Sequence, residues 1–272
     1  GHVHLINGLY DAHRSGAPVL AIASTVATYE MGTRYFQETD TIKLFDDCSY
    51  YNQMATTPKQ FPRMLQAAMQ TAVTLRGVSV VGLPGDLAAT ECQPVDSSLI
   101  TYDMSSDIVL EQFWVERLSK WLNKANKITI YCGIGAKDAH QEVVELSQRL
   151  NAPVAYSFKS KMEIQYDNPN EVGMTGLLGM PSGYNSMHEA QILLLLGTDF
   201  PYTPFMPEDN IIVQVDIKAN RIGRRAKVDM GICGDVKNIL QTLLPHIKQK
   251  TDGSFLKEQL EEVLGTLTER EQ

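Results

Sequence analysis

Unbroken apolar runs and amphipathic stretches alternate along the chain. The run Ile192–Leu196 contains only Ile and Leu and is followed by Gly197 and Thr198, a pattern typical of a strand buried on both faces of a parallel sheet. Similar runs predict strands at residues 18–24, 78–83, 128–132, 154–156, 211–215 and 231–233. Helical spacing of apolar positions predicts helices at residues 1–14, 57–76, 107–126, 139–150, 186–189 and 234–244. The alternation predicts an α/β protein whose parallel sheets form three-layer sandwich domains.

Residues 91–106 separate the predicted elements into two groups, because this stretch contains Pro94 and several serines and lacks periodicity. We therefore predict a first unit over residues 1–95, a linker over 96–105, a second unit over 106–250 and a helical tail over 251–272. The first unit holds only half of the elements of an α/β domain, and the sequence opens within a helix, so we expect a fragment of a longer protein. Shorter features are also expected: loops at residues 29–40 and 158–170, a short helix and turn at 41–50, and a Gly-rich turn at 173–179.

Composition narrows the function classes. The 272 residues are 43% hydrophobic and 21% charged and carry a net charge of −8, which is ordinary for a globular protein and argues against nucleic-acid binding. We find neither a bilayer-spanning apolar run nor a signal peptide, so we expect a cytoplasmic location. The six histidines and the cysteines lack metal-ligand spacing, which favours reduced, structural thiols and no metal site; the cysteines are Cys48, Cys92, Cys132 and Cys233.

Two of the predicted turns contain glycines suited to an anion. Gly133 and Gly135 stand between a strand and a helix, where glycine lets the backbone approach a phosphate, although the third glycine of the dinucleotide fingerprint is absent. Residues 173–179 hold three glycines around Thr175, and their amides and hydroxyl could hold a phosphate or the edge of a planar ring. A tight strand-to-helix turn and a flexible surface loop are the respective structural alternatives.

Charged residues follow several predicted strands. Asp216 ends a strand and suits the hydroxyls of a ribose, or it caps the residues after it. Asp235 has the same alternatives, and its place before a helix favours the cap. Residues 199–202 form a polar and aromatic loop at the edge where parallel sheets bind ligands, and Lys159 and Lys161 could neutralise a diphosphate. Together these turns predict a bound dinucleotide or a similar adenylated cofactor.

An ordered set of segments resembles a known family. The segments are GHVHLINGLYDAHR (1–14), YFQET (35–39), VSVVGLPGD (78–86), DNP (167–169), VGMTGLL (172–178), LGTDFPY (196–202) and QVDI (214–217). They resemble the thiamine-diphosphate-dependent pyruvate oxidases, above all the bacterial pyruvate dehydrogenases that pass electrons to quinone. The resemblance implies that residues 1–95 are the second half of a pyrimidine-binding domain and residues 106–250 a central FAD-binding domain. The tail would then lead to a diphosphate-binding domain, and the activating glutamate and the metal–diphosphate motif would lie outside this sequence.

The resemblance also implies roles for individual residues. FAD contacts are expected at Thr175, Gly176, Leu177, Leu178, Thr198, Asp199, Phe200, Pro201, Tyr202 and Asp216, and by a less specific match at Gly133, Gly135, Lys159 and Asp235. Phe36 and Gln37 match a loop that approaches the thiamine, where Phe36 would lie between the thiamine and flavin rings. The family usually has arginine at Lys159, so this chain keeps the charge there but loses the planar fork.

The implied activity is oxidative decarboxylation of pyruvate, a 2-oxo acid, with thiamine diphosphate and Mg²⁺, electrons passing to FAD and then to quinone. The resemblance further implies a homotetramer, leaves peripheral contact of the full-length protein with the inner membrane open, and implies that this sequence alone is inactive. Acetolactate synthases usually have Arg-Phe-Asp-Asp after the equivalent strand, whereas residues 198–202 fit the oxidases better. Such a synthase, with structural FAD, therefore ranks second, and a non-catalytic nucleotide-binding or assembly domain is the other alternative.

Overall fold

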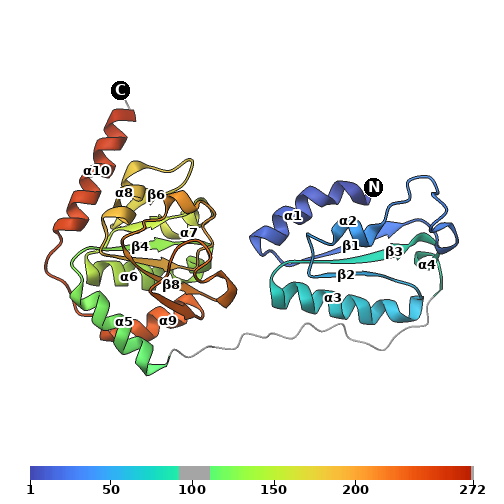
Figure 1. Cartoon of the computed structure of the whole chain (residues 1–272), viewed down its shortest axis with the longest axis horizontal. Coiled ribbons are helices and arrows are strands. Elements are labelled where there is room, and N and C mark those ends of the chain that lie inside the picture. The colour runs from blue at the N-terminus through green and yellow to red at the C-terminus, as the bar shows by residue number, and fades with distance from the viewer. Residues whose placement is uncertain (92–110, 271–272) are drawn as a thin grey trace. The chain divides into compact units, whose positions relative to one another are not determined.

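The computed structural model describes residues 1–91 and 111–270, which belong to two compact units, Gly1–Ser105 and Ser106–Gln272 (Figure 1). Each unit is an α/β structure built on a sheet whose strand pairs are all parallel. The predicted fold class and parallel sheets are therefore confirmed. The linker predicted at residues 96–105, like Cys92, lies outside the described residues.

The first unit is a three-stranded sheet with helices on both faces. Its strand order is β1 (Val19–Thr25), β3 (Val78–Pro84) and β2 (Tyr51–Met54). Helices α1 (Ile6–Ser15) and α2 (Thr41–Phe45) cover one face, where Leu9 and Phe45 are buried with Val78 and Val80. Helix α3 (Phe61–Leu75) covers the other face through Met64 and Ala68, and the short helix α4 (Gly85–Ala88) follows β3.

Strand β2 was not predicted. Its sequence is Tyr-Asn-Gln-Met, and all four residues keep some exposure because β2 lies at the edge of its sheet. A strand at an edge needs no continuous apolar run, so the sequence pattern gave no signal for it. The short helix α4, which directly follows β3, was also not predicted.

The second unit is built on a six-stranded sheet of order β6-β5-β4-β7-β8-β9. The strands are β4 (Ile128–Cys132), β5 (Val154–Tyr156), β6 (Glu171–Met174), β7 (Ile192–Leu196), β8 (Ile211–Asp216) and β9 (Met230–Cys233). Every residue of β4, β5 and β7 is buried, which explains their unbroken apolar runs. From β4 the chain passes to β5 on one side and later to β7 on the other, so the strand order reverses between β4 and β7.

Helices cover both faces of this second sheet. Helices α5 (Gln112–Lys124), α6 (His140–Leu150) and α9 (Val236–Leu243) bury Leu118, Val143 and Leu240 against one face. Helices α8 (Pro181–Glu189) and α10 (Ser254–Arg270) cover the other through Met187, Leu260 and Val263. The unit is therefore the predicted three-layer sandwich, and α5, α9 and α10 are visible around the sheet in Figure 1.

Three local predictions for the second unit need correction. Gly173 and Met174 belong to β6, so the Gly-rich turn begins only at Thr175. Helix α8 begins at Pro181 instead of residue 186, and the short helix α7 (Lys161–Ile164) lies within the predicted loop 158–170. The predicted tail contains α10, whose first half packs on this unit: Phe255 is buried, and Gln259 donates a hydrogen bond to Glu189 at 2.8 Å.

Candidate functional site

The segments that follow the strands of the second sheet lie at one edge, because all paired strands run in the same direction. The residues predicted to contact a cofactor in this unit come directly after the carboxyl ends of six different strands. They are Gly133 and Gly135, Lys159, residues 175–178, residues 198–202, Asp216 and Asp235. The fold therefore places all of them along the edge at which open parallel sheets bind ligands.

The turns after β4 and β7 touch each other through their backbones. Gly133 N donates to Leu196 O at 2.8 Å, and Gly135 N donates to Gly197 O at 2.9 Å. A Cβ atom at Gly133 would lie 2.4 Å from Gly197 O, and one at Gly197, where φ is +57°, would lie 2.5 Å from Gly135 C. Glycine is required here for close packing, which favours the tight-turn alternative. A cofactor contact at Gly133 or Gly135 stays a prediction and would need atoms other than these two amides.

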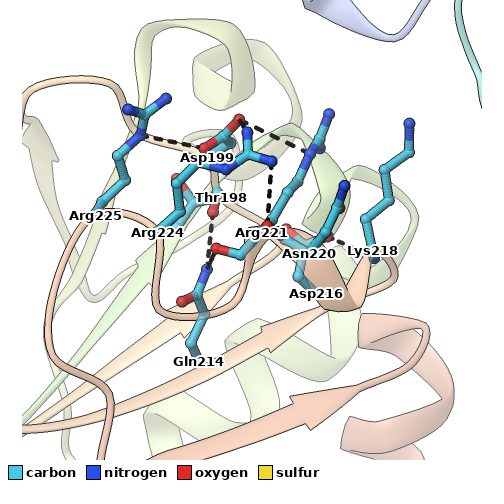
Figure 2. Close-up of polar contacts among 9 residues, drawn as sticks. All are labelled: Thr198, Asp199, Gln214, Asp216, Lys218, Asn220, Arg221, Arg224 and Arg225. Carbon is cyan, nitrogen blue, oxygen red and sulfur yellow. Dashed lines mark hydrogen bonds and ion pairs between the residues drawn. The ribbon is translucent and has the colours of Figure 1, made fainter.

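Asp216 is the most unusual polar group at this edge. Only 2% of its surface is exposed; Oδ1 accepts a hydrogen bond from Lys218 N at 2.8 Å, and Oδ2 has no partner among the described residues (Figure 2). Burial raises the pKa of Asp216, while the Lys218 amide and the charge of Arg221 oppose that shift. A buried carboxylate oxygen without a donor is costly, and a ligand hydroxyl would satisfy it.

Thr175 is a second buried polar group without a partner. It is 2% exposed, its amide donates to Tyr156 O at 3.0 Å, and its hydroxyl has no hydrogen bond among the described residues. The hydroxyl faces α8, since a Cβ atom at Gly183 would lie 2.8 Å from it. The turn then continues through Gly176, whose φ of +133° is readily available to glycine but rare for other residues.

Exposed apolar side chains stand after the strands at the same edge. Leu177 and Leu178 are 70% and 77% exposed, although they follow β6, whose central residues Val172 and Gly173 are buried. Other strand ends present exposed apolar side chains as well, at Ile134, Phe158, Tyr202 and Ile217. Ligand sites combine such an apolar surface with a few well-placed polar groups, so this edge has the composition of a site for a planar organic ligand.

In the loop after β7, Phe200 packs into the core, whereas Asp199 forms ion pairs. Phe200 is 5% exposed and packs against Tyr131 with ring centroids 5.5 Å apart, so its ring belongs to the core. Thr198 is also buried, and its carbonyl accepts from Gln214 Nε2 at 3.4 Å. Pro201 and Tyr202 are exposed. The parts of residues 198–202 that remain available to a ligand are therefore mainly Asp199, Pro201 and Tyr202.

Asp199 is surrounded by three arginines that the sequence analysis did not identify. Asp199 Oδ2 lies 3.1 Å from Arg224 Nη1 and 3.8 Å from Arg221 Nε, and Oδ1 lies 3.3 Å from Arg225 Nε (Figure 2). The arginines come from the segment between β8 and β9. The only signal in the sequence was three arginines within residues 221–225, directly after the strand that ends at Asp216.

The remaining two candidates in this unit, Lys159 and Asp235, differ in their exposure. Lys159 is exposed after β5. Asp235 caps α9, because its side chain accepts a hydrogen bond from Asn238 N at 3.0 Å. The capping alternative for Asp235 is therefore confirmed, and a cofactor contact at either residue stays a prediction.

The loop that contains Phe36 and Gln37 borders a pocket of the first unit. The pocket has a volume of about 520 Å³ and is lined by Thr25 at the end of β1, by Met54 at the end of β2 and by the loop residues 31–32, 34–35 and 38–41, but not by Phe36 or Gln37 themselves. Phe36 is 80% exposed, and Gln37 has a φ of +63°, which is uncommon for a residue with a side chain. Such strained, exposed positions cluster at ligand sites.

Other features of the described residues have a smaller bearing on function. Residues 1–91 and 111–270 contain no helix that is both long and apolar enough to cross a bilayer. In the same ranges, no three His, Cys, Asp or Glu residues are grouped closely enough to hold a metal ion. Cys48, Cys132 and Cys233 are free thiols, and burial raises the pKa of the Cys132 thiol.

Comparison with known proteins shows what the second unit is similar to. Residues 115–243 match the family model of the thiamine pyrophosphate enzyme central domain. The chain is 44% identical over 257 residues to "Uncharacterized 42.6 kDa protein in isoamylase 3'region" of Pseudomonas amyloderamosa, covering 94% of this chain and 65% of the relative. It is 34% identical to "Putative thiamine pyrophosphate-containing protein YdaP" of Bacillus subtilis (strain 168), with 94% and 45% covered.

A pyruvate oxidase is also similar. The "Pyruvate oxidase" of Lactiplantibacillus plantarum is 27% identical, with 92% of this chain and 42% of the relative covered. Acetolactate synthases match at 25–27% identity. The chain thus spans between 42% and 65% of the length of the three named relatives. Residues 115–243 are thus similar to a thiamine pyrophosphate enzyme central domain, and the chain as a whole is similar to a pyruvate oxidase and to acetolactate synthases.

Proposed function

We propose that this chain is part of a thiamine-diphosphate-dependent oxidoreductase that binds FAD at the carboxyl edge of its second sheet. The observation that carries the proposal is the buried Oδ2 of Asp216, which has no partner among the described residues and lies at the end of β8. An acidic residue in this position of a nucleotide-binding sheet accepts ribose hydroxyls. A ligand that carries a ribose would remove the cost of this unsatisfied acceptor.

The residues at this edge fit the different parts of FAD. Asp216 would accept hydrogen bonds from the ribose, and the turn from Thr175 to Leu178 would hold the cofactor through its amides. The exposed side chains of Leu177 and Leu178 would cover a flat ring, which explains two leucines that otherwise face solvent. Bound FAD supplies a two-electron acceptor, while the protein binds and orients it.

For the reaction, we propose oxidative decarboxylation of pyruvate, with the electrons passed from FAD to quinone. The pyruvate oxidase of Lactiplantibacillus plantarum supports the choice of pyruvate, as do residues 198–202, which fit the oxidases. The exposed Phe36 and the strained Gln37, beside a pocket of about 520 Å³, support a role of their loop next to the thiamine. Because the curated relatives are longer, thiamine diphosphate and Mg²⁺ would be held mainly by parts of the protein outside this sequence.

An acetolactate synthase-like enzyme with structural FAD is the second candidate. It is favoured by the acetolactate synthases that match this chain as well as the pyruvate oxidase does, at 25–27% against 27% identity. Both candidates place FAD at the same edge and differ in whether the flavin accepts electrons from the substrate.

Anaerobic reduction of the flavin separates these two functions. The full-length protein, loaded with FAD, thiamine diphosphate and Mg²⁺, is mixed with pyruvate in the absence of oxygen, and the flavin absorbance is followed. The proposed oxidase bleaches the flavin in a single turnover, and a quinone then restores its absorbance. Acetolactate formation without any bleaching would contradict the oxidase and support the synthase.

A further inference from the structure

The proposed function leaves one charged cluster at this edge without a role. Arg221, Arg224 and Arg225 lie between β8 and β9 and converge on Asp199, which follows β7. We call these three arginines the arginine cluster. Since β7 and β8 are neighbours in the sheet, the cluster lies at the carboxyl edge (Figure 2).

The cluster carries more positive charge than Asp199 can neutralise. Three guanidinium groups, which stay charged at any physiological pH, face Asp199, and the charge of Arg221 also acts on Asp216. Even with both carboxylates ionised, one positive charge is left in excess. The side chains of Arg221, Arg224 and Arg225 are 22%, 39% and 34% exposed. An anion would find a net attractive potential at this edge.

The arginine cluster also has hydrogen-bond donors to spare. Arg224 donates through Nη1 to Asp199 Oδ2 and through Nη2 to Asn220 O, both at 3.1 Å, and Arg225 donates through Nε to Asp199 Oδ1. No hydrogen bond to another described residue engages the terminal nitrogens of Arg221 or Arg225, and Figure 2 shows them pointing away from Asp199. These fork-shaped pairs of donors are the geometry that binds phosphate oxygens in pairs.

We propose that the arginine cluster binds a phosphate group, and that Asp199 is its internal counter-ion. The nearby Oδ2 of Asp216, which is buried and unpartnered, would accept a hydroxyl of the same ligand. A phosphate next to a hydroxyl acceptor fits the phosphorylated ribose of a nucleotide. The phosphate would belong either to FAD itself or to a separate nucleotide. The inference thus goes beyond the proposed function, because it holds whether or not the ligand carries a flavin.

The alternative is that the arginines only connect two loops through Asp199. The substitution Asp199→Asn distinguishes a phosphate site from such a connection. In a phosphate site Asp199 competes with the ligand for the arginines, so removing its charge strengthens phosphate binding. In a purely structural connection, removing the charge only loosens the two loops.

Pyrophosphate, titrated into the full chain by isothermal calorimetry at low salt, is the first probe, and FAD is the second. The test variant is the double substitution R224Q/R225Q, and the matched control is K120Q/K124Q. The control lysines are exposed on α5, which ends just before the amino end of β4, so they lie toward the opposite edge of the sheet. Circular dichroism and the thermal midpoint of each variant confirm that it is folded.

We expect saturable pyrophosphate binding that R224Q/R225Q weakens by at least about tenfold, because two charge-assisted contacts are lost. The control should stay within about twofold of the unchanged chain, since its lysines lie toward the opposite edge of the sheet and make no contact with a phosphate at the arginine cluster. Asp199→Asn should bind pyrophosphate more tightly. Competition between pyrophosphate and FAD would assign the site to the cofactor's own diphosphate, and independent binding of both would assign it to a separate nucleotide.

The absence of saturable pyrophosphate binding, or equal binding by both double variants, would overturn the proposal. So would a loss of binding in Asp199→Asn as complete as in R224Q/R225Q, because loop order instead of charge would then govern binding. The two proposals fail separately: pyrophosphate binding without FAD binding contradicts only the FAD site, and FAD binding without pyrophosphate binding contradicts only the phosphate site.

Discussion

The substitution Asp216→Asn should make the unliganded protein more stable and its FAD complex weaker. The change keeps the shape of the side chain and the acceptor atom for Lys218 N, but removes the negative charge. Oδ2 is buried without a partner, and a buried charged acceptor left without a donor costs more than a neutral one. Opposite effects on stability and on binding are the expected signature of a group placed for a ligand and not for the fold.

The magnitudes follow from the one unmade hydrogen bond. Removing an unsatisfied buried charge should raise the free energy of unfolding by about 1 kcal/mol, which corresponds to roughly 2–4 °C in the thermal midpoint for a chain of this size. In the complex, the variant loses a charge-assisted bond worth about 1.5–3 kcal/mol, so its Kd for FAD should rise by roughly ten- to a hundredfold.

The effects of Asp216→Asn on stability and on FAD affinity should depend on pH in a direction that can be measured. Burial raises the pKa of Asp216 in the folded state, so the folded protein holds this proton more tightly than the unfolded chain does. The destabilisation by the ionised group is therefore absent below the unfolded pKa and fully present above the folded pKa. The stability advantage of Asp216→Asn should grow as the pH rises through this window, and FAD binding by the unchanged protein should weaken as the pH falls through it.

Thermal denaturation and FAD titration at several pH values, on the unchanged protein and on Asp216→Asn, measure both effects. Asp209→Asn, at an exposed aspartate before β8, is the matched control and should change neither quantity. If Asp216→Asn lowered the stability of the unliganded protein at neutral pH, its carboxylate would be a stabilising part of the fold. Unchanged FAD affinity would remove Asp216 from the cofactor site.

Further predictions concern packing, capping and the exposed loop. Gly133→Ala should lower the free energy of unfolding by about 1–3 kcal/mol, because its Cβ would lie 2.4 Å from Gly197 O; Gly8→Ala, with nothing within 4 Å, is the control and should not destabilise. Asp235→Ala should cost about 1 kcal/mol in urea denaturation through the lost cap of α9, and no loss would contradict the cap. Phe36→Ala, at an 80% exposed ring, should change stability by less than about 0.5 kcal/mol. In the full-length protein the same change should slow flavin reduction by pyruvate, and an unchanged rate would exclude a role for Phe36 at the thiamine.

The sequence predicted the central strands and two edge strands, β1 and β9, and missed the edge strands β2 and β6. Strands β4 and β7 are central and wholly buried, so their apolar runs begin and end with the strands. Strands β2 and β6 lie at edges and contain polar or glycine residues. A strand at an edge is stabilised by pairing with a single neighbour and needs no unbroken apolar run, so polar edge strands such as β2 leave no signal in the sequence.

The candidate site was predictable where a residue follows a strand directly. Asp216 stands at the end of an apolar run, so its place at the carboxyl edge followed from the parallel sheet. The arginines around Asp199 depend on β8 lying next to β7, and pairs 22–26 residues apart have no local pattern. The burial of Phe200 was not predictable either. Its place in a polar and aromatic loop suggested a ligand contact, but its ring packs against Tyr131 in the core.

The central claim is that residues 106–250 hold FAD at the carboxyl edge of the second sheet, and titration of this chain with FAD tests it most directly. Quenching of the flavin fluorescence is followed until it saturates. We expect one tight site per chain and a loss of affinity in Asp216→Asn. If FAD bound neither to this chain nor to the full-length protein, the carboxyl edge of the second sheet would not be a flavin site.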